Sequence, residues 1–196
     1  MYIHKKWYPI ILLILLLPSL GCSIALPMTA TVNDFVLLGI VANNEQRVDF
    51  RYSSQITDGE IRPFTHTQAT TFQVMIHEYM QNKFVHLTPD AETVIEITLA
   101  GFVIRAEPLD STGKQVVSGL FGAKSNYKLT AKVEVYLSVI REEDGVTKTL
   151  TGTAESTLTA KSDDNTAFAL AHGRNVNNAN NKILMLLNAY FEELGL

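Results

Sequence analysis

The sequence predicts an α+β fold in which two main helices pack on one face of an antiparallel β-sheet. Residues 127–159 alternate between apolar and polar side chains, which is the period of strands with one buried face. Residues 67–83 and 175–194 repeat apolar side chains at intervals of three and four, which is the period of amphipathic helices. One-sided strands and one-sided helices bury their apolar faces against each other, so a sheet covered by helices satisfies every pattern.

The clearest strand runs from Tyr127 to Val139, where apolar residues take every odd position. Asp144-Gly145 then predicts a hairpin turn, because this dipeptide favours the tight turns that join antiparallel strands. The return strand, 147–159, carries threonines along one face. Threonine is a good strand former, so a solvated face explains this side without a functional site.

Two earlier segments also have the pattern of strands. The alternation over 48–52 and the apolar run 35–41 together predict a hairpin over residues 35–52. Within residues 93–105 the apolar side chains change parity after Gly101, and a change of phase at glycine indicates a β-bulge.

The first helix is predicted over residues 67–83, with Thr65 or Thr67 as its N-cap. Pro89-Asp90 predicts a turn soon after it ends. The apolar stripe of this helix consists of Phe72, Met75, Ile76, Tyr79 and Met80.

The second helix is predicted from Asn175 to Leu194. Asp163-Asp164-Asn165 ends the preceding strand and is expected to cap a separate short helical turn through Phe168 to Ala171. The stripe of the second helix consists of Val176, Ala179, Ile183, Leu186, Leu187, Tyr190 and Leu194.

The first 21 residues have the organisation of a secretory signal. The segment Met1–Lys6 contains two lysines, Ile10–Leu17 is an unbroken apolar run, and Gly21 stands directly before Cys22. The apolar run is too short to span a bilayer, which needs about 20 apolar residues. We therefore predict a lipoprotein signal peptide over 1–21, lipidation of Cys22, a lipidated tether over 22–33 and a single α+β periplasmic domain over 34–196.

Two interpretations of Cys22 compete. In the first, Cys22 is lipidated. In the second, Cys22 is an incidental apolar residue and an ordinary signal peptidase cuts nearby, after Ala25. Ser19 stands where leucine is commonest in lipoprotein signals, but the charged start, the apolar core and the Gly-Cys junction favour lipidation. Ser23 follows the cysteine and no aspartate is there to retain the protein at the inner membrane, so resemblance to Gram-negative lipoproteins implies the outer membrane.

Composition excludes several classes of function. The formal net charge is −4, and removal of Lys5 and Lys6 with the signal makes it more negative by two. An acidic domain without a Lys/Arg cluster has no electrostatic footprint for nucleic acid, so no nucleic-acid partner is expected. Cys22 is the only cysteine, so the domain has no disulfide and depends on its hydrophobic core.

No motif predicts catalysis, a metal site or a cofactor. His77-Glu78 begins like the zinc-protease helix motif, but Gln81 takes the place of the second histidine, so His77 is expected to be an ordinary helical residue. Ser111-Thr112-Gly113-Lys114 is similar to part of a phosphate loop, but Pro108 replaces its first glycine. The protein is therefore expected not to be an enzyme.

The chain resembles the YajG-like lipoproteins of Gram-negative bacteria. The resemblance is carried by the segment from Ser125-Asn126-Tyr127 through Ile140, the hairpin to Thr159, the C-terminal helix, and the helix from Thr67 that runs into a short strand and then Ile95-Glu96-Ile97. It implies a small periplasmic domain on the outer membrane, with no established catalytic residue to transfer.

These observations predict a lipid-anchored, non-catalytic envelope lipoprotein that binds or supports a partner assembly. Its expected partners are the membrane, through the lipid on Cys22, and an envelope protein that contacts an exposed sheet edge or the loop 108–124. A lipid- or small-molecule-binding module is the alternative, with the ligand between sheet and helices and the aromatic side chains lining a cavity. An enzyme acting on cell-wall or lipid substrates is a third possibility and lacks a converging set of polar residues.

Overall fold

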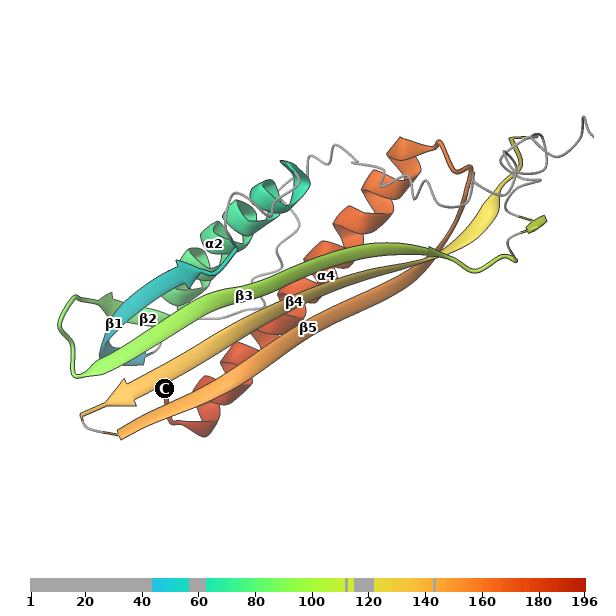
Figure 1. The fold of residues 1–196 in the computed structure, drawn as a ribbon. Helices are drawn as coiled ribbons and strands as arrows, with labels where there is room; N and C mark the ends of the chain where they lie inside the picture. Colours follow the sequence, from blue (N-terminus) through green and yellow to red (C-terminus); the bar gives the residue numbers. More distant parts are fainter. Residues whose placement is uncertain (1–43, 57–62, 112, 115–121, 143) are drawn as a thin grey trace, which may run out of the picture.

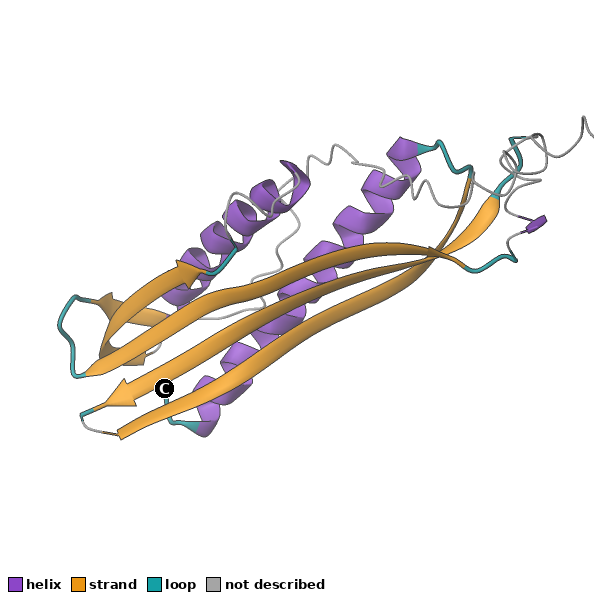
Figure 2. Cartoon of the chain, in the orientation of Figure 1, coloured by secondary structure: helices purple, strands orange, loops and turns teal. Residues whose placement is uncertain are grey.

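The computed structural model describes residues 44–56, 63–111, 113–114, 122–142 and 144–196. These residues form a five-stranded sheet with two long helices on one of its faces (Figures 1 and 2). The predicted signal peptide, Cys22 and the tether 22–33 lie outside the described residues. The α+β class agrees with the sequence prediction.

The sheet is mixed, so the prediction of an antiparallel sheet is partly wrong. Its strands lie in the order β2 (Phe84–Leu87), β1 (Asn44–Ser54), β3 (Thr93–Pro108), β4 (Ser125–Arg141) and β5 (Asp144–Ala160). Strand β1 pairs in parallel with both β2 and β3, whereas β3–β4 and β4–β5 are antiparallel.

The physical reason for the parallel pairs is the path of the chain between these strands. Helix α2 (Pro63–Lys83) returns the chain to the starting end of β1, so the strand that follows it runs parallel to β1. Residues 88–92 then carry the chain to the other side of β1 without reversing it, and β3 is parallel as well. The predicted turn at Pro89-Asp90 is confirmed.

The structure describes only the second half of the predicted hairpin over 35–52. Residues 48–52 belong to β1, as the alternation predicts, but the run 35–41 lies outside the described residues. The neighbours of β1 among the described strands are β2 and β3.

The long hairpin of β4 and β5 follows the sequence pattern closely. Odd-numbered residues of β4 from Leu129 to Val139 face the helices and are buried. Strand β5 pairs with β4 without a register shift from Ser125↔Ala160 to Arg141↔Asp144. The turn therefore begins at Glu142, which has a positive φ of 52°, rather than at the predicted Asp144-Gly145. The predicted bulge is confirmed, because the β3–β4 register shifts between Leu99 and Gly101.

Both helices begin earlier than predicted. Helix α2 begins at Pro63, and proline suits a first helical position, so Thr65 and Thr67 lie inside the helix and the predicted cap is wrong. Helix α4 is continuous from Asn165 to Glu193, so the predicted separate helical turn is also wrong.

Burial explains why helix α4 is continuous. A glycine such as Gly173 inside a helix lowers the stability of the helix by only about 1 kcal/mol relative to alanine. The flanking residues His172, Asn175 and Val176 are buried on the helix side that faces the sheet, and their packing holds this part of the helix together. Asp164 is the N-cap, because its Oδ1 accepts a hydrogen bond of 3.0 Å from the backbone N–H of Ala167. Capping by the Asp163-Asp164 pair is thus confirmed at Asp164.

The core lies between the inner face of the sheet and the two helices. At its centre the rings of Tyr79 on α2 and Phe191 on α4 are stacked, with centroids 6.3 Å apart. Phe84 of β2 meets Phe191 edge to face at 5.8 Å. None of the described helices is long and apolar enough to cross a membrane.

Candidate partner-binding surface

The outer face of the sheet carries no helix in the described part of the chain, because α2 and α4 lie together behind it (Figures 1 and 2). Its middle rows are polar and run across the strands, for example from Ser53 of β1 through Thr98 and Tyr136 to Thr149 of β5. The hydroxyls of Ser53 and Thr98 are 2.8 Å apart and form a hydrogen bond.

Charged side chains on this outer face are paired with one another. The Arg51 guanidinium contacts the carboxylate of Asp49 at 2.7 Å and that of Glu96 at 3.5 Å. These contacts raise the pKa of Arg51 above its ordinary value, chiefly through the hydrogen bond to Asp49. Water around the Arg51 guanidinium screens these contacts, so they add little stability, and their main effect is to leave little net charge on the face.

A shallow hollow of about 330 Å³ lies on this face, between β3, β4 and β5. Tyr136 is its aromatic member and is 42% exposed. The remaining lining residues are Glu96, Thr98, Leu137, Ser138, Thr147, Lys148 and Thr149. Apart from Glu96 and Lys148 these are uncharged side chains, so the hollow offers contact surface and hydroxyl groups rather than a charged site.

Strand β5 forms one edge of the sheet among the described strands. It is 17 residues long and pairs with β4 on one side only, without a bulge. Natural edge strands are usually short, bulged, interrupted by proline or protected by charges, because free backbone N–H and C=O groups pair with other chains. Strand β5 contains no proline, and it is therefore a long edge that lacks most of these protections.

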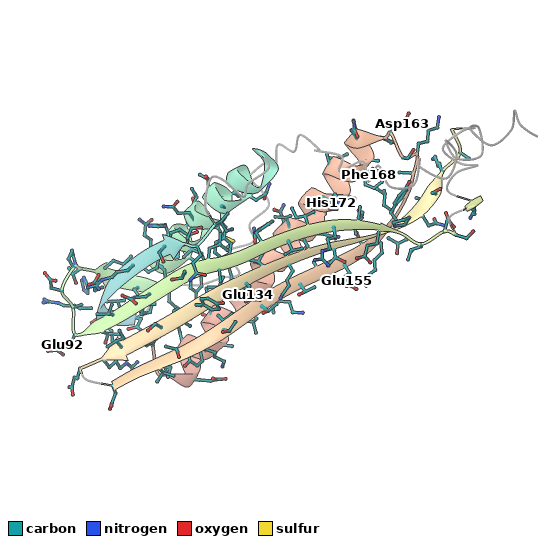
Figure 3. All side chains as sticks on the ribbon, in the orientation of Figure 1. Glu92, Glu134, Glu155, Asp163, Phe168 and His172 are labelled. Carbon is teal, nitrogen blue, oxygen red and sulfur yellow. The ribbon has the colours of Figure 1, made fainter. Side chains whose placement is uncertain are left out.

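Two of the three charged side chains of β5, Lys148 and Glu155, contact neighbouring side chains. The Lys148 ammonium lies 4.1 Å from the centre of the Tyr190 ring and 3.5 Å from the Glu193 carboxylate of α4. Glu155 pairs with Lys128 at 2.9 Å, and Figure 3 labels it on the long strands together with Glu134. Between Lys148 and Glu155 the six residues 149–154 are uncharged. This neutral stretch is the part of the edge best suited to accept another strand.

A second cluster lies at the N-terminal end of α4, where Figure 3 labels Asp163, Phe168 and His172. Phe168 meets the ring of Tyr127 edge to face at 4.8 Å and stacks on His172 at 6.4 Å. His172 is 3% exposed, and this burial lowers the pKa of its imidazole below the ordinary value. The cluster fixes α4 to the far end of the hairpin.

The structure places the other candidate residues in ordinary roles. His77 lies against the rings of Phe50 and Tyr52, and its Nδ1 is 2.9 Å from the carbonyl oxygen of Gln73, as expected for a packed helical histidine. Among the described residues no three His, Cys, Asp or Glu side chains are grouped to hold a metal ion.

The segment similar to a phosphate loop is held by a local ion pair. The Lys114 ammonium contacts Asp110 Oδ1 at 2.8 Å, and Asp110 Oδ2 accepts a hydrogen bond from the backbone N–H of Asn126. These contacts lower the pKa of Asp110, with the Lys114 hydrogen bond as the largest cause. Thr112 and residues 115–121 lie outside the described residues, so the structure describes only part of the loop 108–124, and its predicted contact with a partner stays a prediction.

The aromatic residues considered for a ligand cavity divide into two groups. Phe72 and Tyr79 are fully buried and pack within the core, whereas Phe102 and Tyr127 are half-buried. Burial also raises the pKa of Tyr79. The fully buried pair fills space between the layers rather than lining an opening.

Sequence reasoning identified an exposed sheet edge only in general terms. The hairpin pattern predicted β4 and β5, but it contained no information on which strand is terminal. Among the described strands β5 is the last in the sheet order, and this order follows from pairing between strands far apart in the chain.

No known protein family matches the sequence, and no curated protein matches it. Three solved structures have a similar chain path. Rare lipoprotein B from Shewanella oneidensis is 13% identical, with a TM-score of 0.45, over 76% of this chain and 99% of that one. A minor lipoprotein from Acinetobacter baumannii is also 13% identical, with a TM-score of 0.44, over 71% of this chain and 91% of that one.

The third structure is a neuraminyllactose-binding hemagglutinin homolog from Helicobacter pylori. It is 10% identical, with a TM-score of 0.41, over 77% of this chain and 84% of that one. Likeness at this level carries no argument about function, and the resemblance to YajG-like proteins stays a prediction from the sequence.

Proposed function

We propose that this chain is a non-catalytic lipoprotein, anchored to the outer membrane by a lipid on Cys22, that holds a partner protein through the β5 edge of its periplasmic domain. The observation that supports it most is the uncharged stretch 149–154 in the middle of a 17-residue strand that pairs on one side only within the part of the chain that the structure describes. A partner strand added there gains main-chain hydrogen bonds along its whole length.

The anchor follows from the signal-like first 21 residues. Each methylene of an acyl chain buried in the membrane contributes about 0.8 kcal/mol, and more than one chain gives stable attachment. The domain would then stay at the membrane for the life of the protein, where a bound partner is held as well.

An added strand would lie beside β5 in the plane of the sheet, with half of its side chains on the outer face. Threonines alternate along that side of β5 at 147, 149, 151 and 153, and cross-strand pairs between threonines and other β-branched residues stabilise a sheet. The adjoining hollow around Tyr136 extends the contact surface beyond the backbone hydrogen bonds. The stretch 149–154 is uncharged and the hollow has one acidic and one basic residue, so the proposed partner is a protein with an exposed strand rather than a highly charged ligand.

The anchor is tested by membrane fractionation of the Cys22→Ser variant. We expect the wild-type chain in the outer-membrane fraction and the variant in the soluble periplasmic fraction. A Cys22→Ser chain that stays in the outer membrane would contradict lipidation.

The edge is tested by photo-crosslinking in intact envelopes. A photoreactive phenylalanine at Thr151 of β5 is expected to capture one recurrent protein. The same group at Thr130, on the same face of the inner strand β4 but outside the hollow, is the matched control. A Thr151→Lys variant is expected to lose the partner, because an edge lysine opposes strand addition. Equal capture at both positions would argue against the edge as the contact.

A further inference from the structure

The hollow on the outer face of the sheet has an exposed aromatic wall. It measures about 330 Å³ and lies on the side of β3, β4 and β5 opposite to helix α4 (Figure 1). Tyr136 of β4 lines it, and among the described large apolar side chains that are exposed this is the only aromatic one. Small-ligand sites typically measure about 300–1,000 Å³, so the hollow suits one ring-sized group rather than a long ligand.

The register of the strands explains why space is left beside the Tyr136 ring. Two neighbouring rows of outward-facing residues cross β3, β4 and β5 here: Thr98, Tyr136 and Thr149, and then Glu96, Ser138 and Thr147. The central residue of the first row has a large ring, whereas the central residue of the second row is a serine. Because side chains two positions apart lie on the same face of a strand, Ser138 forms the floor of the hollow and Tyr136 one of its walls.

Polar groups surround the ring, and two of them are held in place. The Glu96 carboxylate contacts the Arg51 guanidinium at 3.5 Å, and the hydroxyls of Thr98 and Ser53 are 2.8 Å apart. Groups that are already positioned lose less conformational entropy when a ligand binds. Further hydroxyl groups, each able to donate and to accept, come from Ser138, Thr147 and Thr149.

The charges around the hollow disfavour an anionic ligand. The Lys148 ammonium is held on the helix side of the sheet, 4.1 Å from the centre of the Tyr190 ring. On the outer face the single guanidinium of Arg51 is shared by two carboxylates, those of Asp49 and Glu96. This group of three side chains therefore has an excess of one negative charge beside the hollow, and a neutral ligand meets no repulsion there.

We propose that this hollow binds one neutral sugar ring in the pyranose form. A pyranose has a flat face of C–H groups and a rim of hydroxyls. The C–H face packs on the Tyr136 ring, which is a weak attraction, and a rim hydroxyl donates a stronger, charge-assisted hydrogen bond to the Glu96 carboxylate. The Ser138 and Thr147 hydroxyls pair with the remaining rim. This site does not depend on the partner strand at β5.

The test follows the ring signals of Tyr136 by NMR in the full lipidated chain, held in a detergent without a sugar headgroup. The probes are methyl β-glucopyranoside and methyl β-galactopyranoside, two neutral pyranoses, and glucuronate is the anionic counterpart. Because the hollow is shallow, we expect saturable shifts with at least one neutral probe at a Kd of about 1 mM. Glucuronate is expected to bind about tenfold more weakly.

Variants are compared through the NMR signals of the probe itself. Tyr136→Ala is expected to weaken binding about tenfold, whereas Tyr136→Phe keeps the ring and should bind like the wild type. Ser138→Leu fills the hollow without removing the ring and is expected to abolish binding. Thr130→Ala, on the same face of β4 but outside the hollow, is the matched control.

The proposal is overturned if neither neutral probe gives a saturable shift or if glucuronate binds as tightly as the neutral probes. It is also overturned if Tyr136→Ala or Ser138→Leu binds like the wild type, or if Thr130→Ala weakens binding equally. Thr151 lies outside the hollow, so Thr151→Lys is expected to lose the partner protein and to keep sugar binding. The two proposals can therefore fail separately.

Discussion

The backbone carbonyl of Ala179 on α4 lies directly over Gly152 of β5. A Cβ atom added to Gly152 would overlap that carbonyl oxygen and would also touch the side chain of Ile183 at 3.0 Å. Because the overlapping atom belongs to the helix backbone, it has no rotamer that relieves the clash. Glycine at this position is what allows α4 to lie close to the edge strand.

Gly152→Ala is accordingly expected to destabilise the domain. Overpacking of a close contact costs about 1–3 kcal/mol, and here the whole helix must move away from β5. Urea unfolding of the variant measures the loss. Gly101→Ala is the matched control, since its added Cβ would meet nothing closer than 3.8 Å. Equal stability of the two variants would show that α4 moves freely over β5.

Phe191→Ala is expected to cause the largest loss of stability. The ring is fully buried, contacts both Tyr79 and Phe84, and leaves a cavity when removed, which costs about 3–5 kcal/mol for a buried phenylalanine. Met185→Ala on the same helix is the control, because Met185 is 57% exposed and its truncation removes little buried surface. Thermal unfolding of both variants distinguishes core packing from a general effect on helix α4.

Asp164→Ala is expected to cost about 1 kcal/mol, the usual value of a lost helix N-cap. The carboxylate accepts the hydrogen bond from Ala167 N that would otherwise be unsatisfied at the start of α4. Asp163→Ala removes an equivalent charge next to it without removing that hydrogen bond. If both variants lose the same stability, the effect is one of charge at the helix terminus and not of capping.

His172 is expected to make stability depend on pH between about 7.5 and 5.5. Burial lowers the pKa of His172 in the folded state below the value of 6.5 in an unperturbed chain, so the unfolded state binds its proton first as the pH falls. Stability from this group is therefore present above pH 6.5, falls as the pH drops below it, and stops changing once the folded state is protonated too.

The measurement is the urea midpoint at pH 7.5 and 5.5 for the wild type, His172→Phe and His86→Gln. His172→Phe is expected to lose stability less steeply between the two pH values, whereas His86→Gln, at an exposed position, should follow the wild type. A wild-type slope that persists in His172→Phe would assign the dependence to other groups.

Local sequence patterns were sufficient to predict a strand or helix that has one solvent-exposed face. The odd positions of β4 and the stripe of α4 were predicted correctly because a period of two or of three and four residues follows directly from which side meets the core. The bulge at Gly101 was also visible, since a change of parity must occur where one strand gains a residue. The acidic cap at Asp164 follows from the same local chemistry.

The predictions were wrong where contacts between residues far apart in the chain oppose a local sequence signal. The predicted separate helical turn through Phe168 to Ala171 is part of the continuous helix α4, which the burial of His172 and Asn175 holds together. Asp144-Gly145 suggested a turn that the longer pairing of β5 with β4 displaces by two residues. Each local signal is worth about 1 kcal/mol or less, which is smaller than the packing that opposed it.

By itself, the sequence determined the α+β class, the one-sided hairpin, the two amphipathic helices and the signal-like segment that ends at Cys22. Only the tertiary structure decided that β1 is parallel to its neighbours and that β5 is the edge of the sheet among the described strands. The reason is physical. Periodicity reports which side of an element is buried, but the element it packs against depends on contacts between residues far apart in the chain.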